Sequence, residues 1–311
     1  MRKLLYILTL LLLCACGSTT QKSDKPTITV TLEPLRYFTE AIAGEHYDVV
    51  SMVPKGSSPE SYDPTPQQLV ALSRSEAYLR IGYIGFEQAW MKKLESNAPD
   101  MKVFDTSRGV DLIRGEGHWH GDHFHEGGVE PHIWNSTHNA IIIAENIYTA
   151  LCELDATHQE EYKNRLDALK ETIQRTNENV RTLLENADST FLIYHPALSY
   201  FARDYGLKQI SIEEGGKEPS PTYLKHLIEL CRQEKARVIF VQQEFDQRNA
   251  QLIADELGIE VVSINPLSYD WAEEMIRVAN ALKNYIIPLT LSSKAERAAF
   301  APSPIAMIIC L

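Results

Sequence analysis

Cysteine is scarce in this chain of 311 residues, and its cysteines are not spaced for pairing. Two of the five lie within the first sixteen residues, and the other three, Cys152, Cys231 and Cys310, are far apart and odd in number. This pattern argues against a disulfide framework and against a zinc site built from cysteines. We predict that these three thiols are small packing residues in the interior.

The chain also has no excess of positive charge and none of the common hydrolase motifs. Thirty lysines and arginines against 42 aspartates and glutamates give a formal net charge of −12. Such a balance argues against nucleic acid and anionic membrane surfaces as partners, and it favours cations. Neither His-Glu-x-x-His nor Gly-x-Ser-x-Gly occurs, which argues against zinc-peptidase and α/β-hydrolase chemistry.

The apolar run at the start of the chain is too short to predict a membrane span. Arg2 and Lys3 precede the run Leu4–Leu13, and Leu13–Cys16 has the pattern of a bacterial lipobox. We predict a signal peptide over residues 1–15, a lipid on Cys16 and a linker over 16–26, so that a lipid anchors a soluble body to the outer face of a membrane. Loss of the signal peptide takes the formal charge from −12 to −14. The alternative is an ordinary secretory signal with a chance cysteine at its end.

From Pro26 onward, short β-branched runs alternate with helical patterns, as in parallel sheets that are covered by helices. About 280 residues remain after the signal peptide and linker, which suits two domains. Hydrophobic residues make up 44% of the chain, enough for two cores. The predicted strands are Thr27–Leu32, Tyr47–Val53, Ala77–Ile81, Met101–Phe104, Thr190–Tyr194, Gln209–Ile212, Arg237–Val241 and Glu260–Ile264.

Two predicted helices begin with the pattern of a capping box. Thr65–Gln68 has threonine at the N-cap, proline at the first helical position and glutamine at the third. Asp270–Glu273 has the same character, and we therefore set Asp270 aside as a metal ligand. Further helices are predicted to begin near Ser136, Ala197, Ser220 and Gln247.

The longest helical pattern separates the two halves of the chain. From about Ala156 to Asn186, apolar residues recur at mostly helical intervals without an intervening glycine or proline. A helix of this length spans about 45 Å and would join the lobes as a stiff rod, which favours small adjustments over large hinge closure. The alternative is a helical hairpin with an unrecognised turn. We assign an N-terminal lobe to residues 27–155, an interlobe helix to 156–186, a C-terminal lobe to 187–287 and a tail of unknown role to 288–311.

Four polar segments lie at places where parallel α/β sheets bind ligands, outside the carboxyl ends of strands. Glu60 follows the second strand, and His132 precedes a helix. His195 follows the first strand of the second lobe, and Asn265 follows its last strand. Successive members are 72, 63 and 70 residues apart, about two strand-helix units each. We predict that two residues from each lobe meet in the cleft as metal ligands.

The motifs around these residues resemble those of a known family. The motifs are Ser58–Pro66 (SPESYDPTP), Glu130–Trp134 (EPHIW), His195–Phe201 (HPALSYF) and Asn265–Leu267 (NPL). With a His-rich loop and a long middle helix, they are similar to the zinc and manganese solute-binding proteins of bacterial ABC importers, the ZnuA/TroA-like group, from about Thr27 to about Leu282. The resemblance implies an α/β fold of two Rossmann-like lobes joined by a rigid helix, with a transition metal between them.

Two of the four positions depart from the pattern of that family. Members that bind zinc usually have histidine in place of Glu60 and aspartate in place of Asn265, whereas His132 and His195 match directly. Both sets carry one carboxylate, so the negative charge has moved across the site. Imidazole nitrogen and carboxylate oxygen in a four-coordinate shell suit Zn²⁺. Mixed histidine and carboxylate sets also suit Mn²⁺ and Fe²⁺.

Each candidate ligand has a simpler alternative. Glu60 is, in that alternative, a solvated loop carboxylate, and His132 and His195 are hydrogen-bonded histidines of the core. Asn265 precedes a proline, an arrangement common in turns. A water or a nearby carboxylate such as Glu244 would then complete the shell.

A His-rich segment lies just before the second motif. Residues Gly117–Glu126 hold four of the ten histidines of the chain, His118, His120, His123 and His125. Such tracts favour soft and borderline metals. We predict a mobile accessory loop that collects zinc at low affinity and passes it to the cleft, or that senses when zinc is plentiful. The alternative is a solvated, variable loop whose histidines bind metal incidentally.

Together these patterns predict a monomeric, lipid-anchored receptor on the extracytoplasmic or periplasmic face that captures Zn²⁺ and delivers it to an ABC permease. Mn²⁺ or Fe²⁺ as cargo is the nearest alternative. A zinc-dependent hydrolase is a second, because two histidines and a glutamate can also hold a catalytic zinc. An adhesin or structural lipoprotein with a metal between its lobes is a third. Ligation requires neutral imidazole, so metal binding should weaken as the pH falls toward about 6.

Overall fold

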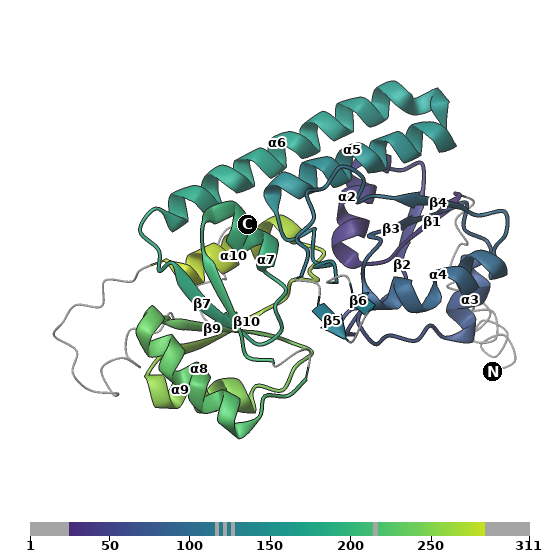
Figure 1. Cartoon of the computed structure of the whole chain (residues 1–311). Helices are drawn as coiled ribbons and strands as arrows, with labels where there is room; N and C mark the ends of the chain where they lie inside the picture. Colours follow the sequence, from purple (N-terminus) through teal and green to yellow (C-terminus); the bar gives the residue numbers. More distant parts are fainter. Residues whose placement is uncertain (1–24, 116–117, 121–122, 126–127, 214–216, 284–311) are drawn as a thin grey trace, which may run out of the picture.

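The structure is a computed structural model of the chain that describes residues 25–283, apart from 116–117, 121–122, 126–127 and 214–216 (Figure 1). The signal peptide, Cys16, Cys310 and the tail at 288–311 lie outside the described residues, so the predictions for them are untested. In the described part of the chain, no helix is both long enough and apolar enough to span a membrane.

The first lobe contains a sheet of four parallel strands in the order β2-β1-β3-β4. Ile28 in the central strand pairs with Val49 on one side and Ala77 on the other, and all three side chains are buried. The strands are β1 (Thr27–Val30), β2 (Asp48–Ser51), β3 (Ala77–Arg80) and β4 (Lys102–Asp105), and the helices between them are α2 (Glu33–Ala43), α3 (Pro66–Leu72) and α4 (Gly85–Asn97). All four strand predictions for this half are confirmed.

The second lobe repeats the scheme with a parallel sheet in the order β10-β9-β7-β8. Its strands are β7 (Thr190–Ile193), β8 (Lys208–Ser211), β9 (Val238–Gln242) and β10 (Glu260–Ile264). Its helices are α7 (Ser199–Tyr205), α8 (Pro221–Glu234), α9 (Arg248–Leu257) and α10 (Trp271–Leu282). β7 and β9 are wholly buried, because helices cover both faces of a parallel sheet. The predicted fold class of two α/β lobes is confirmed.

A single long helix joins the lobes. After α5 (Thr137–Leu154) and a short 3₁₀ turn, η1 (Ala156–His158), α6 runs without a break over Gln159–Leu184. Its 26 residues span about 39 Å. Figure 1 shows α6 running over both lobes, and it packs against α2 of the first lobe and α10 of the second. The hairpin alternative is wrong, and the prediction of one interlobe helix is confirmed.

The hydrophobic interior is not divided between the lobes as the two-core expectation implies. One large core includes Ile28 of the first sheet, Tyr162 and Ile173 of α6, and Phe240 of the second sheet. The smaller core lies within the second lobe, where Leu227 of α8 packs with other residues of α8, α9 and the sheet. The boundary between the cores therefore falls inside the second lobe, because α6 and α10 bury their apolar faces against both halves.

The two capping boxes have different outcomes. The Thr65 side chain accepts a hydrogen bond from the backbone N–H of Gln68, and the Gln68 side chain accepts one from the N–H of Thr65. The box at Asp270 is wrong, since its side chain makes no capping hydrogen bond. Asp270 is instead held by its own N–H, which donates to the Ser268 hydroxyl in the preceding turn.

The cysteines in the described residues behave as packing residues. Cys231 is buried in the smaller core, and burial raises the pKa of its thiol to about 11. Cys152 is partly buried against the large core. Both are free thiols.

Candidate metal centre

Three of the four predicted ligands come together between the lobes. Glu60, His132 and His195 each offer one ligand atom, and these atoms lie within 4.8 Å of one another. They line one cleft together with Gln242, the last residue of β9, and Glu244, two residues after it. Glu60 is exposed, His132 is buried and His195 is partly buried, so the group is open to solvent on the Glu60 side.

A carboxylate orients the ring of His132. The Nδ1–H of His132 donates to Oε1 of Glu130 at 2.5 Å, and the His132 backbone N–H donates to the same oxygen at 2.9 Å. The Ser199 hydroxyl donates to the other Glu130 oxygen at 3.0 Å. Burial raises the pKa of Glu130, but the hydrogen bond and charge of His132 lower it more, and the net shift is downward. Nε2 of His132 is therefore left available to bind a metal.

A second carboxylate orients His195, which lies two residues after the end of β7. The Nδ1–H of His195 donates to Oε2 of Glu213 at 2.8 Å. The Gln242 amide donates to the His195 carbonyl at 2.6 Å, and the Phe245 ring stacks on the imidazole at 5.4 Å with 16° between the planes. Burial lowers the pKa of His195, but the hydrogen bond and charge of Glu213, with the charges of Glu60 and Glu130, raise it above its usual value.

The two imidazoles already stand at ligand spacing. Their Nε2 atoms are 3.3 Å apart. Two nitrogens at about 2.0–2.1 Å from a tetrahedral zinc are separated by about 3.4 Å. The donor set and its spacing therefore fit a small divalent cation without rearrangement of His132 or His195.

Glu60 is placed by the start of α4. Its Oε2 accepts the Gly85 N–H at 3.2 Å, and the neighbouring Pro59 carbonyl accepts the Phe86 N–H at 2.9 Å. The Glu60 backbone N–H also lies 3.3 Å from the Ser58 hydroxyl, which accepts its hydrogen bond. These contacts hold the loop after β2 over the two histidines.

Asn265 follows β10 as predicted, and its side chain belongs to a turn. Its Oδ1 accepts the Leu267 N–H at 3.2 Å, and its own N–H donates to Glu274 at 2.6 Å. The cleft is lined by the next two residues, Pro266 and Leu267. The turn that was the alternative for Asn265 is thus present, and its ligation of a metal is untested.

Glu244 lies in the cleft with the three ligands. Burial raises the pKa of its carboxyl, while its own backbone N–H and the charges of His195 and His132 lower it, with a net upward shift. Glu244 was the alternative that the sequence offered for the fourth ligand.

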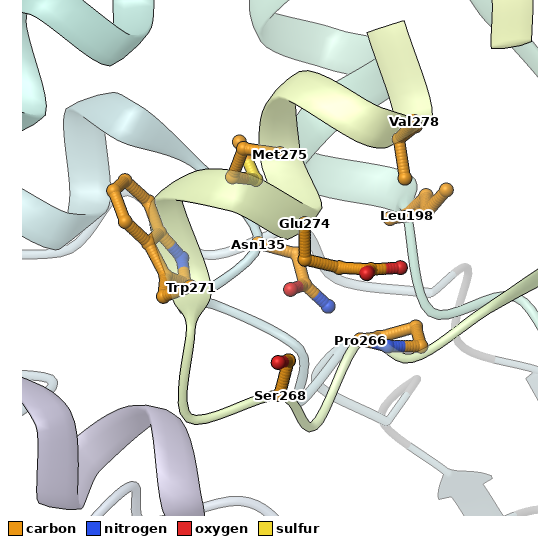
Figure 2. A pocket seen from close by; sticks show the side chains of 8 residues that line it. All are labelled: Asn135, Leu198, Pro266, Ser268, Trp271, Glu274, Met275 and Val278. Atoms are coloured by element: carbon orange, nitrogen blue, oxygen red, sulfur yellow. The ribbon is translucent and has the colours of Figure 1, made fainter. Parts of the chain in front are cut away.

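A second cavity adjoins the metal centre and shares Pro266 with it (Figure 2). Asn135 and Leu198, each three residues after a histidine of the site, face Trp271 and the first turns of α10 across this cavity. The Trp134 indole N–H donates to the Pro266 carbonyl at 2.7 Å, and the Trp271 indole donates to the Trp134 carbonyl at 2.7 Å. These buried bonds tie the His132 segment to the second lobe.

The His-rich segment has regular backbone, where the sequence predicted a loop. Strands β5 (His118–His120) and β6 (His123–His125) pair antiparallel, with His118 opposite His125 and His120 opposite His123. The hairpin is closed at its base by the Gly115 N–H, which donates to the Gly128 carbonyl at 2.9 Å. Glu130 follows closely along the chain, so the hairpin leads directly into the His132 motif.

Sequence reasoning missed the residues that orient the ligands. Glu130 lies inside the Glu130–Trp134 motif, two residues before His132, and this short spacing is the signal that could have identified it. Glu213 gave no signal, because it lies 18 residues after His195 and reaches it only because β7 and β8 are neighbours. The sequence contains no signal that marks Gly85 as part of the site either, since glycine is common in loops.

Comparisons with known proteins show the family to which the chain belongs. A family model described as "Zinc-uptake complex component A periplasmic" matches residues 28–285. The iron ABC transporter substrate-binding lipoprotein MtsA of Streptococcus pyogenes serotype M1 is 31% identical over 273 residues, which cover 82% of this chain and 85% of MtsA. The zinc-binding lipoprotein AdcA of Streptococcus pneumoniae serotype 4 is 27% identical over 306 residues, 94% of this chain and 59% of AdcA.

The fold is also similar to that of a solved structure. A crystal structure of ZnuA superposes on this chain with a TM-score of 0.77 at 36% identity, and the match covers 83% of this chain and 97% of the ZnuA chain. The family model is named for zinc uptake, and MtsA is named as a substrate-binding lipoprotein of an iron ABC transporter.

Proposed function

Because the chain belongs to the family of zinc-uptake complex component A, we propose that it captures Zn²⁺ between its lobes and delivers it to an ABC permease. Glu60, His132 and His195 are the proposed ligands. The observation that supports this most strongly is the pair of Nε2 atoms 3.3 Å apart, each on a ring whose Nδ1 is bound to a carboxylate. Such carboxylate-histidine pairs fix the tautomer and raise the basicity of the metal-binding nitrogen.

Zinc is the proposed cargo because the donor set has two neutral imidazoles and is small. Zn²⁺ accepts such nitrogens together with a carboxylate in four-coordinate shells. Mn²⁺ and Fe²⁺ prefer more oxygen ligands, which Glu244 and water would supply. The relatives also differ in the metal for which they are named, which is iron for MtsA and zinc for AdcA.

We further propose a lipid on Cys16 that holds the protein, as a monomer, at the extracytoplasmic face beside its permease. The support is the lipobox pattern of Leu13–Cys16 and the naming of MtsA and AdcA as lipoproteins. Replacement of Cys16 by alanine should release the protein from the membrane fraction. A Cys16→Ala chain that has lost its signal peptide and still stays in that fraction equally well would contradict a lipid anchor.

The test of cargo is elemental analysis of the full-length protein, purified in detergent without a His-tag after exposure to equal zinc, manganese and iron. The double variant His132→Ala/His195→Ala should lose one equivalent of tightly bound zinc relative to the unaltered protein. His226→Ala, which changes an exposed histidine of α8, is the matched control and should lose none. Retention of the full equivalent in the double variant would show that the cleft is not the site.

For the His-rich hairpin we propose weaker, additional metal sites. Removal of residues 116–126 leaves the Gly115 and Gly128 contact at the base, so the rest of the fold should persist. Titration with zinc should then show fewer weak equivalents and an unchanged tight one. Equal stoichiometry with and without the segment would exclude an accessory role.

A further inference from the structure

The carboxylate of Glu60 lies between the Gly85 N–H and the pair of histidines. Its Oε2 accepts the Gly85 N–H at 3.2 Å. One of its oxygens also lies within 4.8 Å of the ligand nitrogens of His132 and His195. A carboxylate can accept the N–H and bind a metal at the same time, because it has lone pairs on two oxygens.

The N–H group that holds Glu60 belongs to an uncapped helix start. Ile84 is the N-cap of α4 and offers no side-chain hydrogen bond to it. The first N–H groups of a helix have no partner within the helix and carry its positive dipole end. In this helix the Glu60 carboxylate and the Pro59 carbonyl accept from Gly85 and Phe86, so the loop after β2 caps α4 from outside.

Gly85 is required here for space rather than for its backbone angles. It is not among the glycines with positive φ. A Cβ at position 85 would lie 2.7 Å from both the Glu60 carbonyl oxygen and Oε2, and 3.2 Å from the Glu60 Cα. Two of these atoms are backbone, so rotation of the side chain alone does not relieve the overlap. Any side chain at position 85 therefore requires Glu60 or the start of α4 to shift.

We propose that Gly85 is a positioning residue of the metal site and that the start of α4 selects a carboxylate over an imidazole at position 60. This inference rests on the proposed function. Neutral imidazole has one acceptor nitrogen and one N–H. If one ring nitrogen accepted the Gly85 N–H, the other would carry the proton and have no lone pair for a metal. Glutamate accepts from Gly85 with one oxygen and binds the metal with the other.

The first test is a double-mutant cycle on zinc affinity, measured in the full-length protein by competition with a chromogenic chelator at substoichiometric zinc. Gly85→Ala should weaken binding by about tenfold, within the range for groups that orient ligands. In a Glu60→Ala background the same substitution should have no further effect, since the residue acts through Glu60. Gly128→Ala is the control, because a Cβ there has nothing within 4 Å.

Two results would overturn the positioning role. One is unaltered affinity in Gly85→Ala; the other is an equal loss with and without Glu60, which would mean that the substitution acts on the fold at large. A wild-type protein that binds no zinc would instead refute the proposed function and leave the Glu60 and Gly85 contact as a structural cap.

The second test is Glu60→His, which introduces the residue that zinc-binding members of the resembling group usually have. Selection by α4 predicts weaker zinc binding than in the wild type, although histidine is a good zinc ligand. Equal or tighter binding by Glu60→His would overturn the selection. Thermal unfolding of the metal-free variants should show that each is folded before its affinity is compared.

Discussion

Nε2 of His132 and Nε2 of His195 lie 3.3 Å apart, although 63 residues separate them in the chain. The two rings come from different lobes and are each bound at Nδ1 to a carboxylate, Glu130 or Glu213. Two imidazolium ions would repel each other at this distance, whereas two neutral rings can share a proton or a metal between their Nε2 atoms. In the proposed function, a metal ion takes the place of that proton.

Removal of either orienting carboxylate should weaken metal binding without removal of a ligand. Glu213→Gln keeps the size of the side chain but loses the charge that supports His195. We expect about tenfold to a hundredfold weaker zinc binding, and a similar loss for Glu130→Gln. Glu229→Gln, on the exposed face of α8, is the control. Calorimetric titration checks this, and wild-type affinity in both variants would refute an orienting role.

Metal affinity should depend on pH over a window set by His195. Its pKa is raised above the usual 6.5, since the Glu213 hydrogen bond and nearby charges outweigh the lowering effect of burial. A raised pKa means that the metal-free site holds a proton more firmly, and the metal must displace it. Affinity should be full above this pKa and fall as the pH drops through it, with the decline beginning above 6.5.

The measurement is the dissociation constant for zinc over about pH 5 to 8.5. Glu213→Gln removes the negative charge that helps to raise the pKa of His195, while the amide oxygen can still accept the hydrogen bond. The decline should therefore begin at a lower pH in this variant. A constant that is flat over the whole range in the wild type would contradict ligation by imidazole.

The fourth ligand can be assigned by a pair of substitutions. Oδ1 of Asn265 is engaged with the Leu267 N–H, whereas Glu244 lines the cleft. We therefore expect Glu244→Gln to weaken zinc binding by about tenfold, as the loss of a charged group near the ion should. Asn265→Asp keeps the turn acceptor and restores the aspartate of the resembling family, and it should have little effect. A strong gain in Asn265→Asp with no loss in Glu244→Gln would place residue 265 at the metal.

Trp134→Phe should destabilise the contact between the lobes. It removes the indole N–H and leaves the Pro266 carbonyl, in a buried bond of 2.7 Å, without that donor. We expect a loss of about 1–3 kcal/mol in the free energy of unfolding. Trp90→Phe is the control, because its bond to Asp63 is exposed, so that water can replace the lost donor and the loss should be smaller. Urea denaturation measures both, and equal effects would show that the Trp134 bond is not a buried tie.

Much of the fold was predictable because its signals are local. Most strands of the two parallel sheets are short runs that contain β-branched or aromatic residues, and these runs show directly in the sequence. The α6 pattern was equally clear, since Tyr162, Leu166 and Ile173 recur at helical intervals and all are buried. The division of the cores was not predictable. It depends on how α6 and α10 pack against both sheets, and no local pattern encodes that.

The identities of Glu60, His132 and His195 came from the sequence alone, because their residue types and their places near strand and helix ends are local properties. Only the tertiary structure brought their ligand atoms within 4.8 Å and showed which ring nitrogens face the cleft. It also placed Glu213 beside His195, through the neighbouring strands β7 and β8, and Glu60 against Gly85. These contacts join residues 18 and 25 positions apart, and such pairings are decided by strand order and helix packing rather than by nearest neighbours in the chain.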